Sequence, residues 1–405
     1  MGKKSSRCLR FLENLSENSK IGYIQVIKHY EKFHGKSIEE LVCEALDEQS
    51  ERVPSHMLSV IDRIEDFQEH LIGKGLVYGT IQTYMTRIKS IYIKNRIDIP
   101  YIEPVNPKRC KRREYIEYKD ILSPEEIKKA IQYMRPPAQA RTLVIAQGGL
   151  SNEECEHLSL RSFIDELYKY HQCDDDREAL QWLSDENHPV IWVTKLIRQK
   201  TKKPYYAVIG AEAVNKLAEA KLYSMGMMWD KKNPDKLISM NKKAYGATCR
   251  KVNKKCGFGL IAEESKFRSH NLRRFHATRI KGSVLTYEEN SRISNSEIDE
   301  MQGRGKTAVQ DTYIKTNPLE QKLLYAKVMN NVSLWHEYDY ELVDGDVLIS
   351  VKDQSSENKK LKKEVEILTK QLHEKKKASE KVEKLREELG DDVFKEMIGE
   401  ILNAS

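Results

Sequence analysis

The sequence predicts a mainly α-helical protein with one small β-hairpin or sheet. It has an N-terminal helical domain, a larger α+β domain and a C-terminal coiled coil. Apolar residues recur at helical spacing through most of the 405 residues. Residues 190–194 and 205–209 are instead rich in β-branched and aromatic residues, which is typical of two strands of a hairpin. Near the C-terminus, apolar residues recur at alternating steps of four and three amid dense charge, which indicates a coiled coil.

Composition excludes several classes of protein. Charged residues make up 32% of the chain and the formal net charge is +7, which is compatible with a nucleic-acid partner. No apolar run approaches the ~18 residues of a membrane span, and the N-terminus lacks the apolar stretch of a secretion signal. The seven cysteines are scattered without a CxxC pair, which argues against a disulfide framework or a zinc ribbon. We therefore expect a cytoplasmic, DNA-associated protein with free thiols.

After a tail over residues 1–11, residues 12–96 predict a helical domain. Three stretches place apolar residues on one helical face: Ile21, Ile24 and Ile27; Met57, Ile61, Ile64, Phe67 and Leu71; Ile81, Tyr84, Ile88 and Ile91. Pro54 is a helix start signal and Gly73-Lys-Gly75 a stop signal. No strand pattern separates these stretches, so this part is predicted to be a small all-α bundle.

Residues 97–121 predict a basic linker. The segment holds three prolines and, within six residues, five positive charges: Lys108, Arg109, Lys111, Arg112 and Arg113. One interpretation is a solvated hinge between two domains. The other is a linker that tracks DNA phosphates, each of which adds salt-dependent affinity when it is neutralised.

Residues 122–335 predict the α+β domain. Ser123-Pro-Glu-Glu126 is a helix start, with proline at the first position and acids in the first turn. Helical periodicity continues to about Leu167, the hairpin follows, and helices resume from Ala211 to about Trp335.

Residues 336–351 are expected to be a connector, and residues 352–405 a coiled-coil tail. Lys375 and Ser379 interrupt the apolar seam of the tail. Two interpretations are open, a solvated helix and a segment for weak self-association, and we favour the second.

The candidate chemistry lies between residues 270 and 313. His270 and Arg273 are three residues apart and share one helical face, where an imidazole and a guanidinium suit a phosphodiester. A capping box at residues 294–297 opens a short helix that Gly303 terminates. Arg304 follows, and Tyr313 comes nine residues later. Taken alone, each of these residues is more typical of a surface helix or a packed core.

Together these residues resemble the tyrosine recombinase (phage integrase) family, whose catalytic domain contains H-x-L-R and then L-G-H followed by the tyrosine. Here the stretches are His270-Asn-Leu-Arg273 and Gln302-Gly-Arg304, and arginine in the second resembles the archaeal branch. Arg198-Gln-Lys200-Thr201 lies in the hairpin, where the family places its catalytic lysine. Gly149-Leu150 and Glu154 match the family's G-L-R-x-S-E box, and residues 12–96 resemble its core-binding domain.

The resemblance implies that the Tyr313 hydroxyl attacks phosphorus, forms a covalent 3′-phosphotyrosine and releases a 5′-hydroxyl. A tyrosine with an ordinary pKa near ~10 needs help to lose its proton, and His270 is the candidate. Arg273 and Arg304 are the candidates for stabilising charge on the phosphate oxygens.

The family's lysine gives a proton to the leaving oxygen, which makes Lys200 the candidate here. Lys195, Lys202 and Lys203 compete with it for this role. No metal or cofactor is required. The resemblance also implies a C-shaped clamp on double-stranded DNA and a homotetramer that assembles on two DNA sites.

The chain departs from the family at Ser151, which occupies the position of the first catalytic arginine. Losing one preorganised donor to a charged transition state costs ~2.7–4 kcal/mol in a comparable setting. We considered four arginines as substitutes and found no good replacement among Arg141, Arg161, Arg274 and Arg304. Three alternatives remain open: a slow enzyme, a homologue that binds without cutting, or a shifted alignment at Gly148-Gly149. The hypothesis is that Ser151 impairs cleavage and that Ser151→Arg raises it.

The favoured function is therefore a site-specific recombinase, an integrase of a mobile element. The alternative is a catalytically impaired homologue that acts as a DNA-binding or architectural factor, and Ser151 favours it. A coiled-coil interaction protein is a third interpretation, and the family order of the motifs disfavours it. The sequence does not specify the DNA site, the direction of recombination, or whether Tyr313 cuts in cis or in trans.

Overall fold

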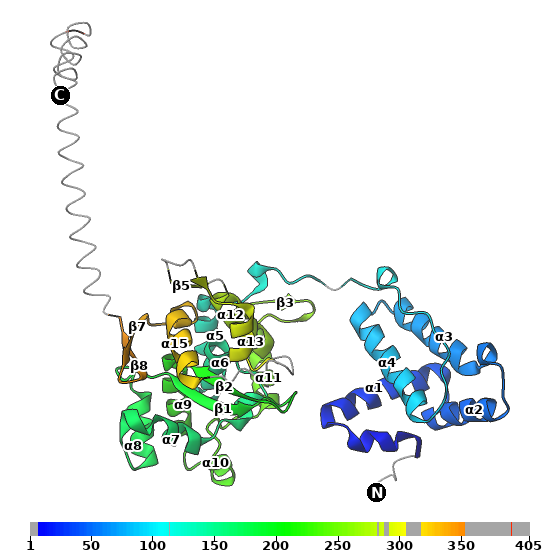
Figure 1. Ribbon diagram of the computed structural model, residues 1–405, viewed down its shortest axis with the longest axis horizontal. Coiled ribbons are helices and arrows are strands. Elements are labelled where there is room, and N and C mark those ends of the chain that lie inside the picture. The colour runs from blue at the N-terminus through cyan, green and yellow to red at the C-terminus, as the bar shows by residue number, and fades with distance from the viewer. Residues whose placement is uncertain are drawn as a thin grey trace. The chain divides into compact units, whose positions relative to one another are not determined.

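A computed structural model of the chain describes residues 7–112, 114–281, 283–286, 291–304 and 317–352, together with Gly390. The chain divides into two compact units, one up to Ile116 and the other from Glu117 (Figure 1). The protein is mainly helical, as the sequence predicts, and the described residues form four small antiparallel two-stranded sheets where the sequence predicts one hairpin. Nearly all of the predicted coiled coil lies outside the described residues.

The first unit is a helical bundle around one apolar core. After the 3-10 helix η1 (Arg7–Asn14), its α-helices are α1 (Glu17–His34), α2 (Ile38–Ser50), α3 (Ser59–Gly73) and α4 (Tyr78–Lys94), with η2 (Ser55–Met57) before α3. The stripe Ile81, Tyr84, Ile88 and Ile91 lines the inner face of α4. None of the three predicted stretches covers α2.

The predicted inner face of α1 is confirmed at Ile27 and wrong at Ile21 and Ile24. Ile21 is 62% exposed and Ile24 is 44% exposed, whereas Val26, Ile27 and Tyr30 are buried. The Tyr30 hydroxyl shares a hydrogen bond of 3.1 Å with the Tyr92 hydroxyl of α4, which holds this face inward. The buried face of α1 is therefore the one that carries Tyr30, and it contacts α4.

The segment expected as a linker is partly built into the first unit. Three of its apolar residues belong to the core of that unit: Ile102, Val105 and Cys110. In the 3-10 helix η3 (Pro107–Arg109), Arg109 donates to both carboxylate oxygens of Glu69, at 2.8 and 2.5 Å. The Lys111 amide donates to the Leu76 carbonyl at 3.3 Å. Residues up to 111 are therefore held by the first unit.

The second unit begins, after the 3-10 helix η4 (Tyr118–Asp120), at α5 (Pro124–Ile131), where Ser123 forms a complete capping box with Glu126. The helices that follow are α6 (Pro136–Gly148), η5 (Glu154–His157), α7 (Leu160–His171), α8 (Asp176–Ser184), α9 (Ala211–Ser224), α10 (Met228–Lys232), α11 (Lys242–Cys256), α12 (Ser269–Ile280), α13 (Asn295–Met301), α15 (Pro318–Val328) and η6 (Met329–Asn331). The strand pairs are β1 (Trp192–Ile197) with β2 (Pro204–Ile209), β3 (Leu260–Ile261) with β4 (Glu264–Ser265), β5 (Val284–Thr286) with β6 (Ser291–Arg292), and β7 (Tyr338–Val343) with β8 (Asp346–Val351). No described helix has the length and apolar character needed to cross a membrane.

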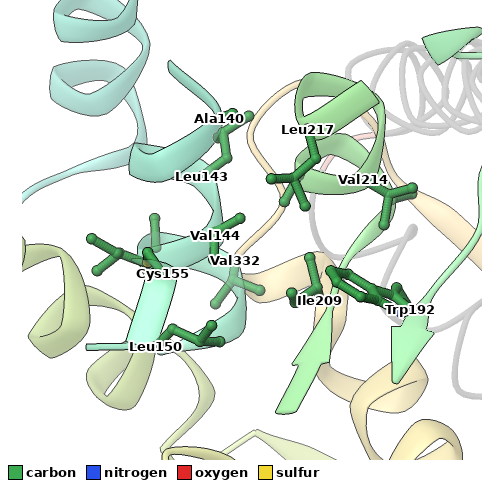
Figure 2. Close-up of a cluster of buried hydrophobic side chains, with 14 of the residues drawn as sticks. Ala140, Leu143, Val144, Leu150, Cys155, Trp192, Ile209, Val214, Leu217 and Val332 are labelled. Carbon is green, nitrogen blue, oxygen red and sulfur yellow. The ribbon is translucent and has the colours of Figure 1, made fainter. Parts of the chain in front are cut away.

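Helix α6 forms the centre of the second unit. Nearly every residue from Pro137 to Gly148 is buried, as expected of a helix that is apolar on all sides. It packs against α9 and α12. Figure 2 shows Leu143 of α6, Leu217 of α9 and Trp192 of β1 in one cluster. The C-terminal end of this rigid helix therefore offers a fixed platform for the turn that follows.

The β1–β2 hairpin is antiparallel, with Trp192 paired to Ile209 and Ile197 paired to Pro204. Its turn is closed by two backbone hydrogen bonds, from the Arg198 amide to the Lys203 carbonyl and from the Lys202 amide to the Arg198 carbonyl. Arg198 therefore stands at the base of this turn, directly after the last residue of β1.

Residues 336–351, expected to be a connector, contain the hairpin β7–β8. Asp344-Gly345 at its turn is a two-residue hairpin signal that the sequence pattern already contained. The buried carboxylate of Glu212 anchors the chain before β7 because it accepts the backbone amides of Leu334, Trp335 and His336 at 2.8, 2.7 and 3.0 Å. The chain after α15 is thereby fixed to the start of α9.

Candidate active site

The turn after α6 places a buried carboxylate at the centre of the site. Gly149 caps α6 with φ +65°, and a Cβ there would lie 2.6 Å from His276 Nδ1. The Ser151 amide donates to Glu154 Oε2 at 2.7 Å, and the Glu154 amide donates to Ser151 Oγ at 3.3 Å. This reciprocal pair turns the Glu154 side chain inward, where the residue is 2% exposed.

Two arginines from distant elements meet at Glu154. Arg198 Nη1 donates to Glu154 Oε1 at 3.0 Å, and Arg273 Nη1 lies 3.6 Å from Glu154 Oε2. Both guanidinium groups also donate to the carbonyl oxygen of Gln302, and Arg198 does so at 2.8 Å. The hairpin, helix α12 and the end of α13 therefore converge on one carboxylate.

Positive charge exceeds negative charge in this cluster. The pKa of Arg273 is lowered to about 10, first by burial and then by the neighbouring charge of Arg198, with a further contribution from Arg304. Glu154 acts in the opposite direction but is a single carboxylate. Such a surplus of guanidinium groups favours the binding of an anion with several oxygen acceptors, such as a phosphate.

Gln302 and His276 hold Arg273 through a chain of hydrogen bonds. The fully buried Gln302 donates through Nε2 to the Arg273 carbonyl at 3.2 Å and to His276 Nδ1 at 3.0 Å. Burial, followed by the charges of Arg273 and Arg304, lowers the pKa of His276 to about 3. A neutral ring therefore holds Gln302 in place at physiological pH. Sequence reasoning missed His276, although its position one helical turn after Arg273 was a signal.

His270 lies in the first turn of α12 and is exposed. Its pKa is lowered to about 4 by partial burial and by the charges of Arg274, Arg268, Arg273 and Arg304, in that order. The imidazole is therefore neutral near pH 7 and is able to accept a proton.

Arg304 follows Gly303, which has φ +61° and packs against the Tyr205 ring, 2.8 Å from where a Cβ would lie. The Arg304 side chain is 45% exposed and its Nη1 lies 3.3 Å from Asp299 Oδ1. The described chain stops at Arg304 and resumes at Asn317, so the predicted nucleophile Tyr313 lies outside the described residues.

Lys200 is exposed in the hairpin turn, two residues after Arg198. Within the described part of the chain its side chain has no hydrogen bond, whereas Lys202 donates to Gln199 Oε1 at 3.0 Å. Lys195 is also exposed, on β1. The structure thus places Lys200 on the same hairpin as Arg198, and it does not bring Lys200 into contact with Glu154.

Four arginines were candidates to replace the arginine that is missing at position 151, and all four contact other residues. Arg141 is fully buried, with Nη2 3.7 Å from Glu156 and its guanidinium over the Tyr245 ring. The other three pair locally: Arg161 with Asp165, Arg274 with Asn271, and Arg304 with Asp299. Arg198 is the residue that reaches the Ser151 turn, through Glu154, and the sequence pattern alone assigns it no role. Its proximity to Lys200 was the available signal.

The predicted DNA-contacting residues of the basic segment belong to the first unit. Lys108 and Arg112 are exposed, and the Arg109 side chain, which is 54% exposed, pairs with Glu69. Lys111 forms a parallel backbone bridge with Val77. Arg113 lies outside the described residues. Among the side chains that the structure describes, no group of three histidine, cysteine or acidic residues is arranged to hold a metal ion.

The sequence matches no protein-family model, and no curated protein matches it. Three similar solved structures are the XerA recombinase, a lambda integrase fragment bound to DNA, and the XerH site-specific recombinase bound to its difH substrate. XerA is 17% identical, with 79% of this chain and 96% of that chain covered and a TM-score of 0.31. The lambda integrase fragment is 10% identical, with 78% and 94% covered and a TM-score of 0.45. XerH is 14% identical, with 77% and 82% covered and a TM-score of 0.44. Similarity at this level does not establish a family for the chain.

Proposed function

We propose that this chain is a site-specific DNA recombinase or integrase of the archaeal, Gln-Gly-Arg type. It cleaves and rejoins DNA through a covalent 3′-phosphotyrosine at Tyr313. The observation that carries the proposal is the arginine cluster around the buried Glu154, which holds more positive charge than one carboxylate neutralises. A neutral His270 stands on the same helix as Arg273, and Arg304 leads directly into the segment that contains Tyr313.

In this mechanism the Tyr313 oxygen attacks phosphorus while His270 accepts the tyrosine proton. The bond between phosphorus and the tyrosine oxygen forms as the bond to the 5′ oxygen breaks, and Lys200 gives that oxygen a proton. Arg273 and Arg304 stabilise the charge on the non-bridging oxygens. The phosphotyrosine stores the energy of the cleaved phosphodiester, and a 5′-hydroxyl from another strand reverses the reaction.

In this proposal, the first unit and its basic segment bind double-stranded DNA. Lys108 and Arg112 are exposed there, which suits phosphate contacts that position the protein without reading bases. The chain assembles as a homotetramer on two DNA sites, and the coiled coil that the sequence predicts for residues 352–405 would support the assembly.

A second candidate function rests on Ser151, which is neutral where the resembling family has an arginine. Under it, the chain is a catalytically impaired homologue that binds DNA as an architectural factor. Both candidates predict salt-dependent DNA binding, so cleavage is the measurement that separates them.

Covalent trapping tests the proposal. Full-length protein is incubated with supercoiled plasmid that carries the DNA flanking its own gene, without metal or ATP, and the reaction is quenched with detergent. Recombination chemistry predicts protein-linked DNA from the wild type and none from Tyr313→Phe. DNA binding by the wild type without any linked product, under conditions where the protein is folded, supports the architectural candidate instead.

A further inference from the structure

We propose that Arg198 supplies the guanidinium that is missing at position 151, so that Arg198 and Arg273 together hold the phosphate that is cut. This inference rests on the proposed recombinase function and concerns the same site. It assigns to the base of the β1–β2 hairpin a role that the resembling family gives to the turn after α6. On this assignment the arginine is supplied by the β1–β2 hairpin and not by the turn after α6, which leaves position 151 free to be a serine.

The geometry places Arg198 where a side chain from position 151 would act. The Ser151 amide lies 2.7 Å from Glu154 Oε2, and Arg198 Nη1 lies 3.0 Å from the other oxygen of that carboxylate. Arg198 and Arg273 also share the Gln302 carbonyl as an acceptor. The two guanidinium groups therefore share one hydrogen-bond acceptor, the Gln302 carbonyl, and one counter-ion, the Glu154 carboxylate.

Both groups retain nitrogens for a ligand. Within the described part of the chain, both side-chain hydrogen bonds of Arg198 use Nη1, and its Nε and Nη2 have no hydrogen bond. Arg273 Nη1 is buried and has no hydrogen-bond partner among the residues that the structure describes. The Arg198 side chain is 15% exposed, so solvent and a ligand reach it. A buried donor without a partner is costly, and a phosphate oxygen at this point would satisfy it.

Charge supports the same assignment. Two guanidinium groups share one carboxylate, which leaves a net positive charge before Arg304 is counted. The transition state of phosphoryl transfer spreads negative charge over its equatorial oxygens, and fixed cations stabilise it. A cluster that only held the hairpin to the turn after α6 would be complete with a single arginine on Glu154.

The first arm of the test measures adduct formation by the full chain on plasmid DNA. Because the loss of one preorganised donor slows comparable reactions by about 100-fold or more, we expect at least that loss from Arg198→Gln. Arg198→Lys keeps the positive charge but is unable to form a bidentate contact with the phosphate. Its rate of adduct formation should therefore lie between those of the wild type and Arg198→Gln. Arg161→Gln is the matched control because Arg161 is exposed and pairs locally with Asp165.

A neutral substrate separates phosphate contact from a role in folding. At the cut position that the wild-type adduct defines, a methylphosphonate replaces one charged oxygen by a methyl group. If Arg198 neutralises that charge, the deficit of Arg198→Gln shrinks to less than about 10-fold on this substrate, because the charge that needed the arginine is gone. An equal deficit on both substrates means that Arg198 only holds the fold, and it overturns the inference.

The second arm does not depend on cleavage. Inorganic phosphate is added to the full chain and thermal unfolding is compared with chloride at equal ionic strength. We expect phosphate to raise the melting temperature of the wild type and of Arg161→Gln by more than that of Arg198→Gln, which keeps only the general stabilisation that an excluded salt gives to any folded protein. The unfolding transition itself shows that each variant is folded.

The two arms distinguish the possible failures. No wild-type adduct together with stabilisation by phosphate through Arg198 contradicts the proposed activity and leaves Arg198 a phosphate ligand. A wild-type adduct that Arg198→Gln forms equally fast contradicts the inference and leaves the recombinase function standing. If there is neither an adduct nor a stabilisation by phosphate that depends on Arg198, both are overturned.

Discussion

Arg198 Nη1 lies 3.0 Å from Oε1 of the buried Glu154, and this contact joins the base of a β-hairpin to the turn that ends the central helix α6. The carboxylate of Glu154 is 2% exposed and also lies 3.6 Å from Arg273 Nη1. One acidic side chain thus organises two cations from different parts of the fold. Substitutions at Glu154 and at Arg198 therefore test separately what this cluster contributes to stability and to catalysis.

Glu154→Gln preserves the shape of the side chain and removes its charge. Because two largely buried guanidinium groups then lack their counter-ion, we expect the free energy of unfolding to fall by about 3–5 kcal/mol in urea titrations. Glu69→Gln is the matched control, since Glu69 and Arg109 are both about half exposed and such pairs contribute ~0–1 kcal/mol. Equal losses from both variants would show that Glu154 does not compensate the arginine cluster.

Gly149→Ala tests the close approach of α6 to His276. A Cβ at this position would lie 2.6 Å from His276 Nδ1 and 3.0 Å from Gln302 Cγ, at φ +65°. Gly257→Ala is the control because Gly257 caps α11 at φ +71° with no atom within 4 Å of a Cβ. The left-handed backbone alone costs about 1–2 kcal/mol, so Gly257→Ala loses only that amount.

We expect Gly149→Ala to lose at least about 2 kcal/mol more than Gly257→Ala, since overpacking adds to the backbone strain. Urea unfolding measures both variants. If the two losses were the same, the region around His276 and Gln302 would be loose enough to accept a methyl group, which would contradict the tight support of Arg273 described above.

His276 makes stability depend on pH. Its pKa is about 3 in the folded chain because of burial and of the neighbouring charges of Arg273 and Arg304, against an ordinary value of about 6.5. Between these values the unfolded chain binds a proton that the folded chain does not, so stability falls as pH falls from 6.5 toward 3. The full slope is about 1.4 kcal/mol per pH unit.

In His276→Asn, the side-chain amide oxygen of the new asparagine is able to accept the hydrogen bond that Gln302 Nε2 donates to His276 Nδ1 in the wild type. We expect the stability advantage of the wild type over this variant to shrink by about 2 kcal/mol between pH 6.5 and pH 4.5. His270 titrates in the same direction in both proteins, so its contribution cancels. A difference that stays constant over this range would mean that His276 has the same pKa in the folded chain as in the unfolded chain.

The effect of Ser151→Arg on the rate of cleavage is expected to depend on whether Arg198 is present. In the wild type, Arg198 already occupies Glu154 Oε1, so a second arginine from position 151 adds less than about 10-fold to the rate of cleavage. In the Arg198→Gln background the same substitution recovers most of the ~100-fold loss. Rates of adduct formation on plasmid DNA measure both. A gain of ~100-fold in the wild type would instead support the original hypothesis that Ser151 itself impairs the enzyme.

Local signals in the sequence predicted local structure well. The helix start predicted at Ser123 begins α5, the capping box at Ser294 begins α13, and the β-branched segments form the β1–β2 hairpin. These features depend on residues a few positions apart, which the sequence shows directly. The inner face of α1 was wrong at Ile21 and Ile24 because the buried face is the one that carries Tyr30, whose partner Tyr92 lies in a distant helix.

The composition of the site was harder to predict for the same reason. His270 and Arg273 share a short motif, and the sequence brought them together. Arg198 meets Glu154 only because the hairpin, η5 and the end of α13 pack around one point, which no short-range pattern encodes. His276 was overlooked because a buried histidine on a helix is ordinarily a core residue, and its contact with Gln302 appears only in the packed fold.

The central claim is that Tyr313 becomes covalently linked to DNA, and identifying the linked residue tests it most directly. Wild-type protein is incubated with the plasmid substrate, the adduct is digested with nuclease and protease, and the nucleotide-bearing peptide is sequenced by mass spectrometry. The account predicts one modified peptide, with a 3′-phosphate on Tyr313, and a free 5′-hydroxyl on the cut strand. A nucleotide on any other residue, or a cut strand that carries a 5′-phosphate, would contradict it.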